Sequence, residues 1–226
     1  MPRQPRRRRV RVGARGRGAA GAARARMIEI EGFILAGGAS SRMGADKAGL
    51  ALGGETLVAR AARALSAAAA RVSVVSSREG HEVFGLPVVP DVHAGAGALG
   101  GLHAALAACR APWALVVSCD LPFVTPELFA RLASFAGDDC DAVAPVQPDG
   151  RQQPLCALYA ARACRAAAAR LLEEGERRPR VLLREVRARW VFPAELSDLT
   201  RAEYFFTNVN TPAEYERAKA TMNDER

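Results

Sequence analysis

The chain has 226 residues, half of them apolar, which is enough for one α/β domain with a full core and too few to suggest two. No apolar run approaches the roughly 18 residues that a membrane-spanning helix needs, which argues against an integral membrane protein. The net charge of +8 comes from residues 1–26, which hold ten of the 32 basic residues and no acidic one, leaving 22 basic against 24 acidic residues. The charge therefore does not indicate a nucleic-acid-binding domain.

The chain opens with this Arg-rich tail, ahead of a single predicted domain over residues 27–226. Val10 and Val12 are the only aliphatic residues of the tail larger than alanine, so we expect it to be disordered. Three interpretations of the tail stay open. Either translation starts at Met27, or the tail is a basic arm that touches nucleic acid or acidic lipid, or it is an export signal. The last is the least favoured, because no apolar stretch follows the arginines.

Beyond the tail, apolar runs alternate with amphipathic stretches. The apolar runs predict strands at residues 28–35, 72–75, 86–89, 113–118, 141–146, 155–159, 189–192 and 204–206. Helical spacing predicts helices at residues 55–71, 99–109, 126–135, 161–174 and 211–222. Thr125 is the expected N-cap ahead of Pro126, and Gly175 is the expected end of the fourth helix. This alternation predicts a three-layer α/β/α sandwich with a mainly parallel, Rossmann-like sheet, whose ligands bind beyond the carboxyl ends of the strands.

The segment after the first predicted strand, residues 35–47, has the composition of a phosphate-binding loop. Gly37 and Gly38 lack side chains, so phosphate oxygens can approach the backbone N–H groups. Arg42 and Lys47 supply cations that suit a triphosphate and a departing pyrophosphate. The loop is not the GxxxxGK[ST] motif, because Ala48 follows the lysine, and it does not match GxGxxG.

Two further segments offer oxygen ligands. Asp120 follows the apolar run 113–118 and would point into the crevice, where a carboxylate suits Mg²⁺; the alternative is that it caps a turn. The amide oxygen of Asn210 could be a second ligand, although either Asn210 or Thr211 could instead cap the last helix.

Cysteine and histidine show no pattern of a metal site. The five cysteines contain no CxxC pair, and we interpret them as reduced, small buried residues of a cytoplasmic protein. His81, His93 and His103 are isolated from one another in sequence, so surface or helix positions are expected for all three. His93 follows Asp91 closely, and its alternative place is beside the ligand.

Four segments together resemble the molybdenum cofactor guanylyltransferase family over about residues 30–220. They are the loop 35–47, which reads LAGG-x-S-x-RMG-x-DK, the turn 119–122, the strand 153–159 and the ending 208–212. The chain is less similar to sugar-phosphate and cytidylyl transferases of the wider nucleotidyltransferase class. The family transfers GMP from GTP to the terminal phosphate of molybdopterin carrying molybdenum, with Mg²⁺, in the cytoplasm.

The resemblance implies roles for individual residues. Leu35, Ala36 and Gly37 would touch the nucleotide through their backbone, and Arg42 and Lys47 would bind its phosphates.

Beyond that loop, the resemblance implies that Asp120 holds Mg²⁺ and that Asp91 matches a family position that contacts the guanosine. From the residues themselves, we expect Asn210 to be the second metal ligand and Asp120 also to contact the nucleotide. Ser76 stands where the family often has Asn, which puts that nucleotide contact in doubt. Ala98 replaces a proline in a loop that usually reads GPLGG, so this loop is expected to be less rigid.

The acceptor side is less defined. Gln152, Gln153 and Tyr159 would line the pterin site, with core packing as the alternative for Tyr159. Expected partners are GTP, a molybdopterin-type acceptor and, transiently, molybdenum-insertion proteins and molybdoenzyme chaperones; membrane and nucleic acid are not expected. Two rivals remain: a CTP-dependent enzyme that makes the cytosine dinucleotide, and a non-catalytic carrier of nucleotide or pterin.

Overall fold

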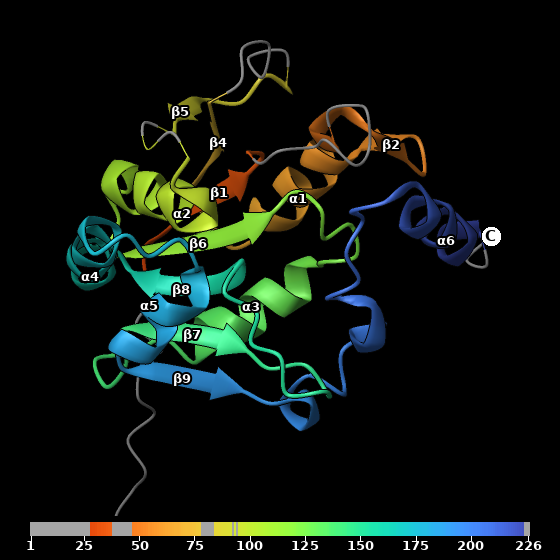
Figure 1. Ribbon diagram of the computed structural model, residues 1–226. Coiled ribbons are helices and arrows are strands. Elements are labelled where there is room, and N and C mark those ends of the chain that lie inside the picture. The colour runs from red at the N-terminus through yellow and green to blue at the C-terminus, as the bar shows by residue number, and fades with distance from the viewer. Residues whose placement is uncertain (1–27, 38–46, 78–83, 92, 94, 224–226) are drawn as a thin grey trace, which may run out of the picture.

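The computed structural model describes residues 28–37, 47–77, 84–91, 93 and 95–223. They form a seven-stranded sheet in the order β5-β4-β1-β6-β8-β7-β9, with helices on both of its faces (Figure 1). Neighbouring strands are parallel except β8, which is antiparallel to both β6 and β7. The three-layer α/β/α fold with a mainly parallel sheet is therefore confirmed. Among the described residues, no helix is both long and apolar enough to cross a bilayer.

The strands of this sheet are β1 Ile30–Leu35, β4 Arg71–Ser76, β5 Val88–Pro90, β6 Trp113–Ser118, β7 Ala142–Pro145, β8 Cys156–Ala160 and β9 Ala188–Val191. A separate hairpin pairs β2 Ala51–Leu52 with β3 Glu55–Thr56. The helices are α1 Leu57–Leu65, α2 Gly97–Ala108, α3 Pro126–Ser134, α4 Ala161–Glu173, α5 Pro179–Glu185 and α6 Pro212–Asn223. Short 3₁₀ helices are η1 Lys47–Gly49, η3 Pro193–Glu195 and η4 Ala202–Tyr204.

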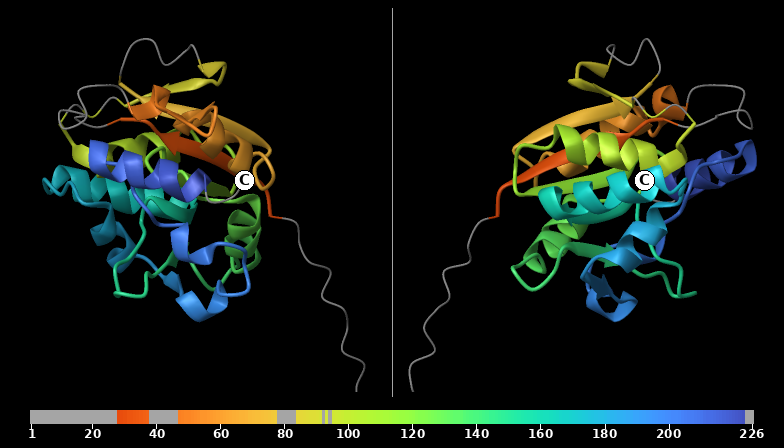
Figure 2. Two further views of the ribbon diagram at one scale, coloured as in Figure 1. Left: turned by 90° about the vertical axis from the view of Figure 1, so that its right-hand side faces the viewer. Right: turned by 60° about the vertical axis from the view of Figure 1, so that its left-hand side comes forward.

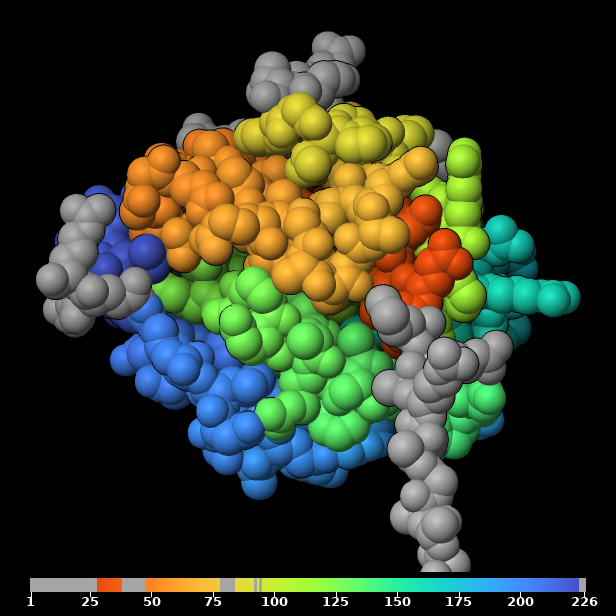
Figure 3. All heavy atoms as spheres, turned by 180° about the vertical axis from the view of Figure 1, so that it is seen from behind, coloured from red at the N-terminus to blue at the C-terminus, as the bar shows by residue number. Residues whose placement is uncertain are grey.

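The central strands read as continuous apolar runs because both of their faces are covered. In β1, Ile30 and Ile34 pack into one core with α1 and α3, whereas Phe33 and Leu35 pack into a second core with α2, α4 and α5. Figure 3 shows α1 (orange) and α3 (green) covering the first of these faces. The arrowheads of β6, β7 and β9 point to the right-hand edge of Figure 1, and α6 lies along that edge, facing the viewer in the left panel of Figure 2.

Local capping explains where two helices begin. The Thr125 hydroxyl accepts a hydrogen bond from the N–H of Leu128 at 3.3 Å, so the predicted N-cap is confirmed. The helix predicted at 55–71 is shorter, because Thr56 accepts from the N–H of Ala59 at 3.2 Å and starts α1 at Leu57. The residues before it belong to the β2–β3 hairpin, which the sequence pattern did not reveal.

The strand predicted at 204–206 is wrong. Tyr204 is the last residue of the 3₁₀ helix η4, which begins after Arg201, whose φ of 64° lies in the left-handed region, and Phe205 and Phe206 form the turn that follows. The turn sends Tyr204 to a cluster beside Phe123, with ring centroids 5.9 Å apart, and buries Phe205 fully in the core beneath α3. Tyr204 and Phe205 thus pack into two different apolar clusters although they are not in a strand.

Candidate functional site

The residues that follow the parallel strands are joined by backbone hydrogen bonds at one edge of the sheet. The N–H of Cys119 donates to the carbonyl of Leu35 at 3.1 Å, and the N–H of Ala36 donates to Val75 at 3.0 Å. The N–H of Asp91 donates to the carbonyl of Ser76 at 3.2 Å. The ends of β5, β4, β1 and β6 therefore form one continuous rim.

The described part of the glycine-rich loop starts on this rim. Leu35 and Ala36 are buried, whereas Gly37 is exposed, and a Cβ atom placed on it would meet nothing within 4 Å. No packing contact therefore requires a glycine there, which suits a backbone left open to a ligand. Lys47 begins η1 on the far side of the loop. Residues 38–46, with Arg42, and the side chain of Lys47 lie outside the described residues, so their phosphate-binding roles stay predictions.

Asp120 lies two residues beyond the end of β6. Its Oδ1 atom is buried, and its backbone carbonyl accepts a hydrogen bond from the N–H of Val209 at 2.9 Å. This bond brings Asn208 and Asn210 beside Asp120, although about 90 positions of chain separate them. The structure thus brings together the two residues that the sequence offered as metal ligands.

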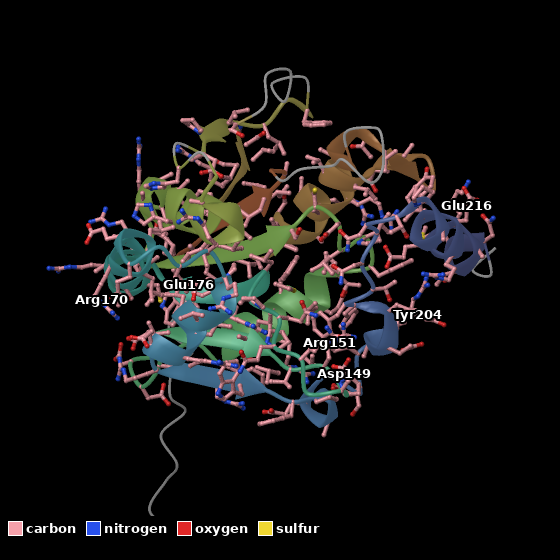
Figure 4. The ribbon with its side chains drawn as sticks, viewed as in Figure 1. Asp149, Arg151, Arg170, Glu176, Tyr204 and Glu216 are labelled. Atoms are coloured by element: carbon pink, nitrogen blue, oxygen red, sulfur yellow. The ribbon has the colours of Figure 1, made fainter. Side chains whose placement is uncertain are left out.

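A small apolar cluster holds this junction. It contains Val209, fully buried, together with Leu52, Leu57, Phe123 and Ala218. Because the cluster joins the β2–β3 hairpin, α1, the turn after β6 and α6, it fixes the segment that carries Asn210. Tyr204 is partly buried and packs against this cluster, and Figure 4 shows it at the right-hand edge of the molecule.

Arg60 of α1 is a supporting residue that sequence reasoning missed. Its guanidinium donates to the carbonyl of Pro122 at 3.1 Å, to that of Leu52 at 3.4 Å and to the sulfur of Met222 at 3.6 Å. Burial lowers the pKa of Arg60, and the carboxylate of Glu55 opposes that shift. From sequence alone, Arg60 looks like any arginine on the outer face of an amphipathic helix.

The start of α6 fixes the backbone around Asn210. Thr211 is the cap, since its hydroxyl accepts from the N–H of Glu214 at 3.2 Å. The Glu214 carboxylate in turn accepts from the N–H groups of Asn210, at 2.8 Å, and Thr211, at 2.9 Å. Those bonds, chiefly that from Asn210, lower the pKa of Glu214. Of the two capping alternatives, the structure thus selects Thr211.

Asp91 lies where β5 ends, against α2. A Cβ atom on Gly101 would be 3.6 Å from Asp91 Oδ2 and 3.8 Å from Leu35 Cδ2, so the carboxylate sits close to the start of the glycine-rich loop. Asp91 Oδ1 accepts from the N–H of His93 at 3.2 Å. The ring of His93 reaches His103 of α2, with 2.9 Å between Nε2 and Nδ1. No sequence pattern indicated this histidine pair.

On the acceptor side, the core alternative holds for Tyr159. Its ring is fully buried in β8, and its hydroxyl donates to the carbonyl of Pro154 at 2.6 Å. Burial raises its pKa well above the ordinary value. Gln152 and Gln153 are half-buried, and the backbone N–H of Gln153 donates to Pro145 at 2.9 Å. Tyr159 therefore supports the turn that presents the two glutamines and does not itself line a pocket.

The thiols match the expectation of small buried residues. None of the five, all of which lie in the described part of the chain, forms a disulfide, and four of them, Cys119, Cys140, Cys156 and Cys164, are buried. Burial raises the pKa of Cys156 to about 12, so this thiol stays protonated at neutral pH. No group of three or more His, Cys, Asp or Glu side chains among the described residues could hold a metal ion by itself.

Residues 32–190 match the family model of the MobA-like NTP transferase domain. The chain belongs to this family. A probable molybdenum cofactor guanylyltransferase of Pelotomaculum thermopropionicum is 37% identical over 205 residues, which cover 88% of this chain and 97% of that protein. A molybdenum cofactor guanylyltransferase of Rhizobium johnstonii is 37% identical over 189 residues, covering 81% and 88%. The resemblance seen in the sequence and the assignment as a nucleotidyltransferase are thereby confirmed.

A solved structure agrees. Molybdopterin-guanine dinucleotide biosynthesis protein A from Archaeoglobus fulgidus aligns with a TM-score of 0.72 at 26% identity, covering 86% of this chain and 99% of that one. The match to the MobA-like family model ends at β9, so the segment that carries Asn210 lies beyond it. The relatives reach further, because the alignment to the Pelotomaculum protein spans nearly all of that protein.

Proposed function

We propose that the chain transfers GMP from GTP to the terminal phosphate of molybdopterin carrying molybdenum, which forms the guanine dinucleotide cofactor and releases pyrophosphate. The observation that carries the proposal is the convergence of Asp120, the Asn208–Asn210 segment, the Leu35–Gly37 backbone and Asp91 on one rim of the sheet. The relatives named molybdenum cofactor guanylyltransferases supply the substrate class.

The reaction needs no covalent enzyme intermediate. An oxygen of the acceptor phosphate forms a bond to the α-phosphorus of GTP, and the bond from that phosphorus to the oxygen bridging to the β-phosphate breaks. A general base is not required, because a phosphate monoester is already largely ionised at neutral pH. What this chain contributes is positioning and electrostatic stabilisation.

The residues divide this work. The backbone of Leu35, Ala36 and Gly37 holds the nucleotide, while Arg42 and Lys47 bind its phosphates and stabilise the charge of departing pyrophosphate. On the other side of the rim, Asp91 contacts the guanosine. Ser76 ends β4 on the same rim, where its carbonyl accepts the N–H of Asp91, and this position supports its nucleotide contact.

Mg²⁺ is the cation that the oxygen donors fit. One carboxylate, one amide oxygen and the phosphates of the substrate form a ligand set that this ion accepts. Asp120 and Asn210 would hold it, and the ion would neutralise charge on the phosphates. The burial of Asp120 Oδ1 at the rim supports this role.

The acceptor has a candidate place beside the Asn208–Asn210 segment. A cavity of about 360 Å³ opens between the β7–β8 loop and the η3–η4 region, bounded among others by Gln147, Glu203, Phe206 and Thr207. Figure 4 shows Asp149 and Arg151 on the same loop, where they form an ion pair of 2.6 Å. The aromatic ring and the carboxylate suit a planar pterin with N–H donors. We place the reaction in the cytoplasm, with transient contacts to molybdenum-insertion proteins and molybdoenzyme chaperones.

The proposal is tested by incubating the protein with molybdenum-loaded molybdopterin, Mg²⁺ and one nucleotide at a time, and measuring pyrophosphate. We expect release with GTP and little with CTP or ATP. Calorimetry checks base choice separately, and tighter binding of CTP than of GTP would replace the guanylyl assignment by the cytidylyl one. Tight GTP binding without release of pyrophosphate from GTP, whichever acceptor is supplied, would favour the carrier.

A further inference from the structure

The turn between β5 and α2, of which residues 91, 93, 95 and 96 are described, lies against Gly100 and Gly101 of α2. A Cβ atom on Gly100 would be 2.8 Å from the Cβ of Ala96 and 3.1 Å from the Cβ of His93. These distances leave no space for a methyl group, so the turn lies directly on the helix backbone. A glycine inside a helix lowers its stability relative to alanine, and here it allows the turn to approach.

A hydrogen bond between two imidazoles ties this turn to the helix. His93 Nε2 and His103 Nδ1 are 2.9 Å apart, and the rings meet edge to face, with centroids 4.8 Å apart and planes at 70°. One of the two nitrogens must carry the proton and the other must accept it. The pair therefore keeps its bond when it is neutral or carries one extra proton, and loses it when both rings are charged.

The same turn holds the carboxylate of Asp91. The backbone N–H of His93 donates to Asp91 Oδ1 at 3.2 Å. The second oxygen, Oδ2, lies over Gly101 next to Leu35, at the start of the glycine-rich loop. A continuous line of contacts therefore runs from His103 through His93 to Asp91.

We propose that His103 is a positioning residue for nucleotide recognition, which acts through His93 to hold the Asp91 carboxylate toward the guanosine. The inference rests on the proposed function, because that function assigns the guanosine contact to Asp91. His103 itself lies on the far side of His93 and reaches the nucleotide only through it.

Protonation gives the arrangement a measurable signature. The groups that face His103 are His93 and Asp91 from the turn and Arg165 from α4. Burial lowers the pKa of His103 from 6.5, with His93 and Arg165 acting in the same direction and Asp91 opposing them. His103 is thus neutral at pH 7.5. Because the pair loses its bond only when a second proton binds, GTP binding weakens in acid, at a pH below the ordinary imidazole value of about 6.5.

Three variants separate positioning from packing. His103→Leu fills the space without a hydrogen bond, and His103→Asn places an amide near Nδ1 that bonds to His93 but does not titrate. Ala107→Ser, at an exposed position one turn further along α2, is the control. Each is compared with wild-type protein by calorimetry with GTP and Mg²⁺ at pH 7.5 and pH 5.0.

At pH 7.5, we expect His103→Leu to raise the Kd for GTP about tenfold, the loss of one hydrogen bond in a recognition site. His103→Asn and Ala107→Ser stay within about twofold of wild type. At pH 5.0, His103→Asn binds GTP more tightly than wild type. Because both Kd values are measured at the same pH, their ratio does not depend on the titration of GTP itself. The chain has three histidines, so imidazole NMR signals assigned by single variants report directly on the His93–His103 bond.

The possible failures are distinct. Wild-type protein that binds no GTP at pH 7.5 overturns the proposed function and this inference with it. Wild-type protein that binds GTP, with His103→Leu binding equally well, overturns the inference alone. A folded His103→Asn variant whose affinity for GTP falls as much as that of His103→Leu also overturns the inference, because packing would then explain the effect. The same holds if its affinity depends on pH as that of the wild-type protein does.

Discussion

Two neighbouring glycines of α2 offer the sharpest test of how the rim is built. Gly100→Ala and Gly101→Ala make the same chemical change in the same helix, and each gains up to about 1 kcal/mol of helix propensity. Their surroundings differ. The new Cβ on residue 100 would be 2.8 Å from Ala96 Cβ, closer than carbon atoms approach, whereas that on residue 101 has its nearest neighbour, Asp91 Oδ2, at 3.6 Å.

The signs of the two effects should therefore be opposite. Gly101→Ala meets only ordinary van der Waals contacts, so we expect a gain of about 0.5–1 kcal/mol in the free energy of unfolding. Gly100→Ala forces His93 and Ala96 away from the helix, and overpacking of this kind costs about 1–3 kcal/mol. After the propensity gain, the two variants should differ by about 2 kcal/mol, or roughly 4–8 °C in Tm for a domain of this size.

Thermal and urea unfolding of the two variants and the wild-type chain measure this difference. Since helix propensity cancels between the variants, what remains is the contact of the turn with α2. Equal stabilities, or a Gly100→Ala variant more stable than Gly101→Ala, would refute the seating of the turn on this helix. The slope of the unfolding free energy against urea concentration must be the same in both variants and the wild-type chain. A lower slope in either variant would show that its denatured or native state has changed.

Four further predictions use other parts of the molecule. Asp120→Asn should fold normally but lose orders of magnitude in kcat at saturating Mg²⁺, because the metal's contribution is about several kcal/mol; near wild-type turnover would remove Asp120 from the site. Arg60→Met should lower the free energy of unfolding by about 2 kcal/mol through its lost hydrogen bonds, whereas the exposed Arg63→Met should change it by less than about 0.5 kcal/mol; equal effects in urea melts would contradict this. The bonds from Arg178 and from neighbouring backbone N–H groups lower the pKa of Glu176 to about 2, so stability present above pH 4.5 should fall toward pH 2, and Glu176→Gln should flatten this part of the Tm profile. A chain that begins at Met27 should keep the Tm and turnover of the full chain, and a loss of either would make the tail structural.

Local signals made part of the fold predictable. The strand 113–118 was predicted with its observed bounds, because an unbroken apolar run is what a strand covered on both faces requires. The start of α3 followed from Thr125 and Pro126 alone. Asp91 and Asp120 could be placed at one edge, since each follows a predicted parallel strand.

Tertiary contacts decided what the sequence could not reveal. The role of Arg60 could not be predicted, because it depends on a hydrogen bond to the carbonyl of Pro122, 62 positions away in the chain. His93 and His103 looked isolated because a loop and a helix, separated by no regular spacing, bring them together. Helix α5 was missed because its apolar residues Val181, Leu182 and Leu183 are adjacent and give only a short pattern. Arg42 and the side chain of Lys47 remain predictions from the loop motif.

The hydrogen bond between Val209 and Asp120 ties the site to the order in which the chain is synthesised. All seven strands of the sheet precede residue 192, so a nascent chain can complete the sheet before Val209 is made. The hydrogen bond from Val209 to the carbonyl of Asp120 can form only after the segment that follows β9 has been synthesised. A ribosome that stops shortly after β9 would release a chain with every strand of the sheet but without Asn210, so such a chain would lack the second proposed metal ligand.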